Sequence, residues 1–187
     1  MDVTKILEQD HRDAESLFDR IPKAEGAKRQ SLIDELNTAL RAHMELEERA
    51  LYPAIEPVTG TEDVQEANQE HQLARQGLDS MLELAPDEPG FDGALESVKA
   101  GILHHVEEEE RDVFPKVRKD GPAVLDEIAT PFMQLRVELG MPMEADALSA
   151  ASSKDELVSE AKAADVQGAD SMTKAELADA LVAKMSA

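Results

Sequence analysis

Apolar residues recur every three to four positions along most of the first 120 residues, a spacing typical of amphipathic α-helices. Clusters of Pro and Gly interrupt this pattern and mark loops. The pattern predicts four long helices over residues 3–21, 28–52, 61–84 and 91–119. Because short loops join antiparallel neighbours, we expect an all-α fold built as an up-down-up-down four-helix bundle.

Proline and glycine also set the expected helix ends. Pro53, Pro57 and Gly60 are expected to break the chain after the second helix, because proline has no amide hydrogen to donate. Thr59 or Thr61 is expected to cap the third helix through its side-chain oxygen.

The pattern changes after residue 121. A further amphipathic helix over residues 123–139 is expected to pack on the bundle, and the small, polar residues 145–153 are typical of a linker. We therefore expect a bundle domain with its accessory helix over residues 1–144, and a linker with a small helix-loop-helix module over residues 145–187.

Composition narrows the possible functions. Aromatic residues make up only 3% of the chain, which favours helices packed through aliphatic side chains. The formal charge of -22 argues against direct binding to nucleic-acid phosphates or anionic membranes. There is no cysteine, so any metal must be held by nitrogen and oxygen ligands. No apolar run reaches the length of a signal peptide or membrane span, and a cytoplasmic protein is expected.

One segment occurs twice. HMELEERALYP recurs as HVEEEERDVFP, so the chain carries His-x-x-x-Glu-Glu-Arg-x-x-aromatic-Pro in two copies. Residues four apart lie on the same face of a helix. His43 and Glu47 can therefore bind at one site, as can His105 and Glu109.

Two more histidines extend the repeat. His11 and His71 precede the two long motifs by similar intervals and lie on the inward stripes of the first and third helices. A single inward histidine is more often a structural core residue than a ligand. Buried carboxylates need a cation, however, and only Arg75 is a candidate basic partner on these stripes. Mixed nitrogen and oxygen donors of this number suit iron or manganese better than tetrahedral zinc.

The combination of His11, HMELEERALYP, His71 and HVEEEERDVFP resembles the hemerythrin-like, or HHE cation-binding, proteins over residues 1–120. The resemblance implies a non-haem centre of two iron ions with an oxo or hydroxo bridge, iron being preferred to manganese. It implies these ligands: His11 and His43 on one iron, His71 and His105 on the other, and Glu47 and Glu109 bridging both.

The chain departs from the oxygen-carrying hemerythrins at one place. Those proteins have a further histidine four residues after the third-helix ligand, and here that residue is Arg75. The change leaves coordination positions open for oxygen, hydrogen peroxide or nitric oxide. The expected function is reaction with such small oxidants, with catalase-like peroxide decomposition as the candidate enzymatic activity. The alternative is an oxygen or iron sensor. Nothing in the sequence indicates a pocket for a large organic substrate.

Several other residues lie beside the expected ligands. Tyr52, the only tyrosine, is matched in the repeat by Phe114. Aromatic packing at the helix end is its favoured role, and a hydrogen bond to an iron-bound oxygen is the alternative. His104 is rotated about 100° from the ligand beside it and is expected outside the ligand set. Glu48 and Glu110 are expected to be solvated or to support ligands.

The C-terminal segment has its own signals. Ser153 to Glu156 and Thr173 to Glu176 each form a capping box, the usual start of a helix. Residues 148–187 resemble the helix-loop-helix module at the N-terminus of the Rho termination factor, which is related in shape to SAP domains. Acidic residues outnumber lysines in this segment, so direct nucleic-acid binding is not expected. A docking role toward a protein partner, or a purely structural role, is expected for residues 148–187 instead.

Overall fold

A computed structural model describes residues 1–141 and 145–185, and every regular element in these two ranges is helical. Four long helices form the bundle. They are α1 (Val3–Arg20), α2 (Gly26–Leu46), α4 (Thr61–Leu82) and α5 (Phe91–Glu108). Within the described ranges, no helix is long and apolar enough to cross a membrane.

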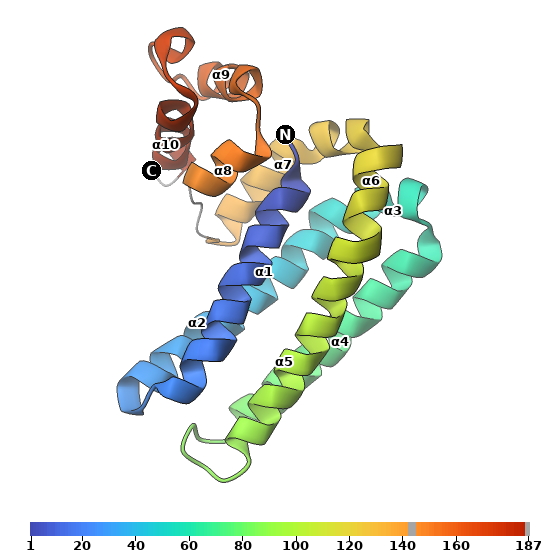
Figure 1. Cartoon of the computed structure of the whole chain (residues 1–187), viewed down its shortest axis with the longest axis vertical. Helices are drawn as coiled ribbons and strands as arrows, with labels where there is room; N and C mark the ends of the chain where they lie inside the picture. The colour runs from blue at the N-terminus through green and yellow to red at the C-terminus, as the bar shows by residue number, and fades with distance from the viewer. Residues whose placement is uncertain (142–144, 186–187) are drawn as a thin grey trace.

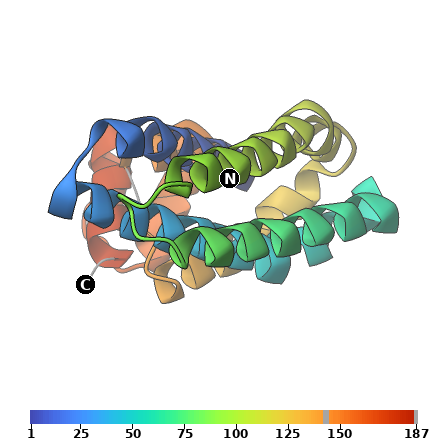
Figure 2. The ribbon, with the colours of Figure 1, turned by 90° about the horizontal axis from the view of Figure 1, so that it is seen from below.

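The four helices alternate in direction. In Figure 1, α1 runs downward, α2 upward, α4 downward and α5 upward, and the two lower connections are short. Seen along the bundle in Figure 2, α1 and α5 form one layer and α2 and α4 the other. Contacts join α1 with α2 and α4 with α5, and further contacts join the two hairpins. The predicted up-down-up-down arrangement is confirmed.

The expected break at Pro53 is wrong, because the second helix continues past it. A π-helical turn, Glu47–Leu51, leads directly into α3 (Tyr52–Thr59). In this wide turn the amide of Tyr52 donates to the carbonyl of Glu47, five residues back. Proline in a regular helix clashes with the carbonyl four residues earlier, and the wide turn just before Pro53 relieves that conflict. The helix ends only at Gly60.

The second copy of the repeat has the same local structure. A π-helical turn, Glu109–Val113, joins α5 to α6 (Phe114–Asp120), and the amide of Phe114 donates to the carbonyl of Glu109. Pro115 stands where Pro53 stands in the first copy. The duplicated sequence therefore encodes a duplicated backbone irregularity, which explains why both long helices run on through their prolines.

The predicted cap of the third helix is wrong as well. Gly60, with φ of 111°, occupies the capping position of α4, and no side chain caps the helix. The hydroxyl of Thr59 instead donates to the carbonyl of Ile55, one turn back in α3. Glycine reaches this positive φ without the steric cost that a side chain would add, so the sharp reversal fits glycine.

The C-terminal region contains more helix than expected. After α7 (Pro122–Glu138), the segment predicted as a linker forms α8 (Ala145–Ala151), so that prediction is wrong. Alanine is the strongest helix former, and buried Leu148 anchors this alanine-rich segment against the core. The predicted domain boundary at residue 144 lies outside the described residues.

The last two helices begin as predicted. They are α9 (Lys154–Ala163) and α10 (Lys174–Met185). Both capping boxes are confirmed by reciprocal hydrogen bonds, Ser153 with Glu156 and Thr173 with Glu176.

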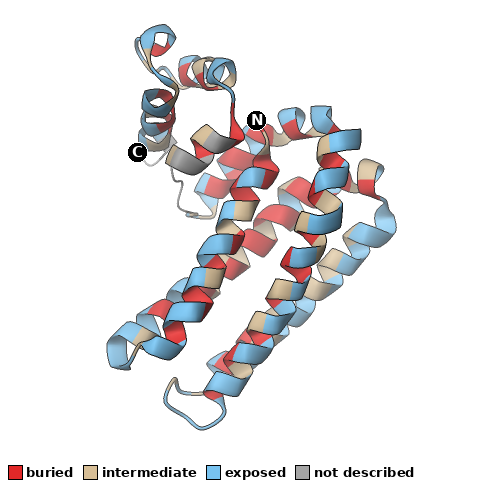
Figure 3. Ribbon diagram, in the orientation of Figure 1, coloured by how far each residue is buried: buried red, intermediate tan, exposed pale blue. Residues whose placement is uncertain are grey.

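Two apolar cores lie at opposite ends of the bundle. One joins the start of α1 with α3, α6, α7 and the C-terminal helices, and the other joins the end of α1 with α2, α4 and α5. Figure 3 shows buried positions along the facing sides of the bundle helices. On α1, Leu7 belongs to the first core and Ala14 to the second, and His11 lies between them. The bundle therefore has a buried polar layer between two apolar ones.

Candidate metal centre

All six residues singled out by the sequence come together in this polar layer. Each is at least 93% buried, with exposed fractions from 0% for Glu47 to 7% for His43. Every bundle helix contributes one histidine, and each glutamate opens a π-helical turn. The residues are His11, His43, Glu47, His71, His105 and Glu109.

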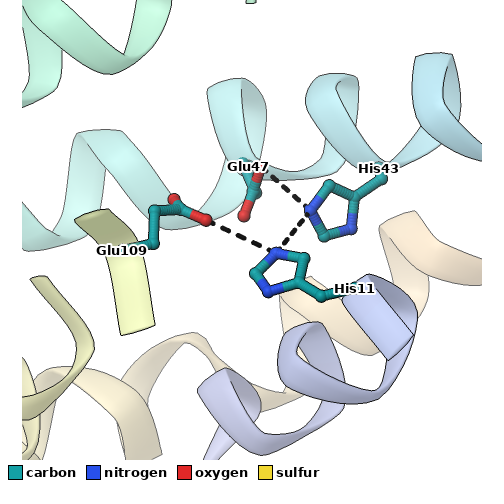
Figure 4. Close-up of side chains that lie close together, drawn as sticks. All are labelled: His11, His43, Glu47 and Glu109. Carbon is teal, nitrogen blue, oxygen red and sulfur yellow. Dashed lines mark hydrogen bonds and ion pairs between the residues drawn. The ribbon is translucent and has the colours of Figure 1, made fainter. Parts of the chain in front are cut away.

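The histidines lie in two pairs. The Nε2 atoms of His11 and His43 are 3.2 Å apart, and those of His71 and His105 are 3.0 Å apart. Figure 4 shows the first pair turned toward Glu47 and Glu109. The pairs match those that the sequence resemblance implies.

The two carboxylates lie between the histidine pairs. Oε2 of Glu47 is 3.3 Å from Nε2 of both His43 and His71. Oε2 of Glu109 is 3.5 Å from Nε2 of His11 and 3.6 Å from that of His105. Each carboxylate thus faces one histidine of each pair.

This donor set fits metal ions. Both oxygens of Glu47 and Oε2 of Glu109 are buried and have no hydrogen-bond donor, and such atoms are costly unless a cation satisfies them. Four imidazole nitrogens converge on the same space. Nitrogen and oxygen donors at this density are the ligands that first-row transition metals use in proteins.

Without metal, protons take the place of cations. Burial lowers the pKa of His43, but the charges of Glu47 and Asp10 outweigh it and raise this pKa to about 10. For Glu47 the directions are reversed. Burial raises the pKa of this carboxyl, but His43 and His71 bring it well below its usual value. A metal must therefore displace histidine protons as it binds.

The π-helical turns explain why an aromatic ring reaches the centre. Residues five apart point in different directions on a regular helix, but a π-helical turn brings them to the same face. Tyr52 therefore lies over Glu47, and Phe114 over Glu109. The ring of Phe114 stacks on His11 at a centroid distance of 6.0 Å.

Tyr52 has a polar role that the favoured sequence interpretation did not include. Its hydroxyl donates to Oε1 of Glu109 at 3.0 Å and lies 3.2 Å from Nε2 of His71 and 3.4 Å from Nε2 of His105. Burial and the charge of Glu109 raise the pKa of Tyr52 well above 10. The phenol thus keeps its proton at neutral pH.

A carboxylate faces the Nδ1 atom of each of the four buried histidines. Three contacts are hydrogen bonds of 2.8–3.0 Å, and the fourth is an ion-pair distance of 3.5 Å outside hydrogen-bond geometry. The pairs are His11 with Glu110, His71 with Glu48, His105 with Glu70, and His43 with Asp10. An Nδ1 proton shared with a carboxylate leaves the Nε2 lone pair toward the centre.

Sequence reasoning missed two of these carboxylates, Asp10 and Glu70. A signal was available, because an acid directly precedes both His11 and His71. Each acid reaches the histidine of the neighbouring helix rather than the one beside it, and sequence spacing does not show that contact.

The four carboxylates that face the Nδ1 atoms are the outer carboxylates of the centre. Arginines contact three of them. Arg136 makes two hydrogen bonds to Asp10 at 2.5 and 2.6 Å, and Arg12 contacts Glu110. Arg75 binds both oxygens of Glu48 at 2.7 and 2.9 Å. The partner of Arg75 is thus Glu48, which lies outside the six-residue centre. Although burial raises the pKa of Glu48, His71 and Arg75 lower it to about 2.

A cavity of about 670 Å³ connects this centre with the surface between α1 and α2. All four ligand histidines line it, and Leu17, Leu40 and Met44 are among its apolar walls. Its size is within the usual range of small-molecule pockets. Nothing in the sequence indicated a cavity of this size.

Fold and site together define a helical-bundle protein with a buried histidine and glutamate centre suited to cations. The model of the hemerythrin HHE cation-binding domain matches residues 2–117. The chain belongs to this family.

Two proteins illustrate the relationship. A solved structure of a hemerythrin HHE cation-binding domain-containing protein from Mycobacterium kansasii aligns with 97% of this chain and 99% of that one, with a TM-score of 0.62 and 22% identity. A DNA nickase from a Nostoc species is 25% identical over 121 residues. That match covers 64% of this chain but only 34% of the nickase.

Proposed function

We propose that the centre holds two iron ions and that the loaded protein reacts with a small oxidant, foremost hydrogen peroxide. The observation that carries the proposal is the placement of two carboxylates, short of hydrogen-bond donors, between two histidine pairs. His11 and His43 would bind one ion, and His71 and His105 the other. Glu47 and Glu109 would bind both.

Iron is preferred to manganese because the proposed chemistry is redox chemistry and the donor set is rich in imidazole. Bound iron supplies a centre that cycles between ferrous and ferric states. The protein supplies the positions of the donors. The carboxylates of Glu48, Glu70 and Glu110 each accept the Nδ1 proton of a ligand histidine and fix the orientation of its ring.

Tyr52 holds a proton beside the centre. Its hydroxyl donates to Glu109, and its raised pKa keeps that proton in place at neutral pH. Tyr52 is itself buried, with an exposed fraction of 2%. If Glu109 binds metal, this phenol can turn its proton from Glu109 toward a small polar ligand.

The cavity favours uncharged oxidants. Asp13, Asp34 and Glu35 line it against the single arginine Arg20, so its outer part carries net negative charge. Such a field repels anions and leaves neutral molecules unaffected. Hydrogen peroxide, oxygen and nitric oxide are all neutral.

Metal analysis combined with an oxygen electrode tests the proposal. We expect two irons per chain, and oxygen evolution when peroxide is added to the loaded protein. Glu109→Gln and His43→Ala should lose iron and oxygen evolution together, whereas Glu107→Ala, on the exposed side of α5, should retain both. Two bound irons without oxygen evolution would refute peroxide decomposition. Absence of iron binding would refute the metal assignment itself.

DNA nicking is not extended to this chain. The nickase is only partly covered by the match, and the charge of -22 opposes binding to phosphates.

A sensor is the second candidate, and the packing of α8 on α1 favours it. The amide of Asp2 donates to the carbonyl of Ala151 at 2.8 Å, and the two helices share one apolar core. Metal binding at His11 would act on α1 and, through α1, on residues 148–187. These residues are the proposed docking region for a protein partner. Hydrogen exchange of the full chain tests this route. Equal protection of α8–α10 in metal-free and loaded protein would count against it.

A further inference from the structure

One of the four outer carboxylates differs from the others. Three of them are held by arginines, whereas Glu70, within the described part of the chain, contacts no arginine. Its Oε2 atom accepts from Nδ1 of His105 at 2.8 Å. Its other oxygen faces outward, toward His104. Glu70 thus has histidines as its neighbouring basic groups where the other three carboxylates each have an arginine.

The groups around Glu70 are metal-ligating side chains. Nε2 of His104 is 3.7 Å from Oε1 of Glu70 and 3.6 Å from Oε1 of Glu108. These separations lie within ion-pair range but are too long for hydrogen bonds, so the imidazole and the two carboxylates face a common space without direct hydrogen bonds between them. His104 and Glu108 lie one turn apart on α5, and Glu70 reaches them from α4.

From this geometry we propose a second metal site, in which Glu70, His104 and Glu108 bind one divalent cation such as Mn²⁺. One imidazole and two carboxylates are suitable donors for first-row divalent ions. The two negative carboxylates also attract the positive ion and balance its charge. The three ligand atoms lie within 4.8 Å of one another. The site is separate from the buried centre and does not depend on the iron proposal.

The surroundings leave space for the rest of a coordination shell. His104 is 65% exposed, so water reaches its ring. Glu70 and His104 also line a cavity of about 340 Å³ between α4 and α5, walled by small residues such as Gly77 and Gly101. Three protein ligands with several waters is a coordination that hard divalent ions accept readily.

Glu70 links this site to the buried centre. One of its oxygens would bind the outer cation while the other holds Nδ1 of His105. The cation would then do for Glu70 what Arg75 does for Glu48, by fixing the carboxylate that orients a ligand histidine. Occupancy of the outer site would therefore act on one ligand of the inner one.

Manganese binding to the full-length, iron-loaded protein tests the proposal. The electron paramagnetic resonance signal of free Mn²⁺ counts the bound ions, and water proton relaxation reports whether a bound ion retains water. We expect one Mn²⁺ per chain with exchangeable water, and no loss of iron. His104→Ala and Glu108→Gln should each weaken this binding about tenfold or more. His43→Ala should retain it, even if that variant loses the inner metals.

Glu107→Gln is the matched control. Glu107 directly precedes Glu108 on α5 and carries the same charge, but its carboxylate contacts Arg111 rather than His104. This variant should weaken Mn²⁺ binding by no more than about twofold, as expected of an exposed charge. Equal weakening by Glu107→Gln and Glu108→Gln would show diffuse attraction and overturn the proposal. So would Mn²⁺ uptake that occurs only as iron leaves.

Discussion

Replacing Arg136 by Met should leave the buried carboxylate of Asp10, next to the centre, without its arginine partner. The Arg136 guanidinium from α7 makes two hydrogen bonds to Asp10, and the side chains of the two residues are 4% and 12% exposed. Methionine is apolar and similarly long, so Arg136→Met removes the charge while filling much of the space. Asp10 would then lose the partner that compensates for its burial.

The expected loss is large. Removing one partner of a buried ion pair costs about 3–5 kcal/mol. With a urea dependence of about 2–3 kcal/mol per molar, the midpoint of urea unfolding should fall by roughly 1–2 M. Metal-free protein at pH 7, followed by circular dichroism, is the appropriate sample, because metal binding would add its own stabilisation.

The pH dependence has a definite sign. In the native protein, burial raises the pKa of Asp10, but Arg136 and His43 lower it to below 3.8. The carboxylate therefore stabilises the fold above pH 3.8, and this stabilisation is lost as pH falls through its lowered pKa. In Arg136→Met the lowering by Arg136 is lost, so the pKa of Asp10 should rise relative to that in the native protein. The stability gap between the two proteins should then narrow as acid protonates the stranded carboxylate.

A double variant separates charge from packing. If the stranded carboxylate causes the loss, Asp10→Asn combined with Arg136→Met should be more stable than Arg136→Met alone. A double variant no more stable than the single one, together with a gap that does not change with pH, would refute the reasoning. Those results would assign the loss to the packing of the arginine carbon chain.

Three further predictions concern protonation, hydrogen bonding and packing. With a His43 pKa of about 10, the melting temperature of metal-free protein should fall between pH 6.5 and 10, because stabilisation by protonated histidine is lost there; a flat profile would contradict this. Tyr52→Phe should destabilise metal-free protein by about 1–2 kcal/mol in urea unfolding, since a buried carboxylate loses its donor. Gly121→Ala would place a methyl group 2.6 Å from Val58 and should cost about 1–3 kcal/mol, whereas Gly101→Ala, where the space is open, should be neutral or stabilising by thermal melting.

The parts of the centre that sequence predicts well are those fixed by local helix geometry. The spacing of His43 and Glu47 places both on one face whatever surrounds the helix, and the same holds for His105 and Glu109. Because this spacing occurs twice, the sequence also predicts two matching histidine and glutamate pairs that face each other in one centre. The bundle follows from the same periodicity, because four apolar stripes can be buried only against one another.

The parts that sequence predicts poorly depend on backbone irregularity. Pro53 signals a break when a regular helix is assumed, yet a π-helical turn lets the helix pass it. That turn also changes which residue follows Glu47 on the inward face, and so moves Tyr52 from the helix end to the centre. The outer acids Asp10 and Glu70 were missed for a different reason. Their contacts cross between helices, and the register between helices is set by packing rather than by spacing along one chain.

Arg75 changes the argument for function once its contacts are known. Its place in the sequence indicated the absence of a fifth histidine and a candidate partner for the buried glutamates, but in the structure it holds Glu48, the carboxylate that orients His71. The phenol of Tyr52 lies 3.2 Å from Nε2 of His71. The side of the centre that lacks a fifth imidazole thus has a protonated hydroxyl instead. A hydrogen-bond donor at this place would face a small molecule bound to the proposed irons, and this supports the proposed peroxide chemistry.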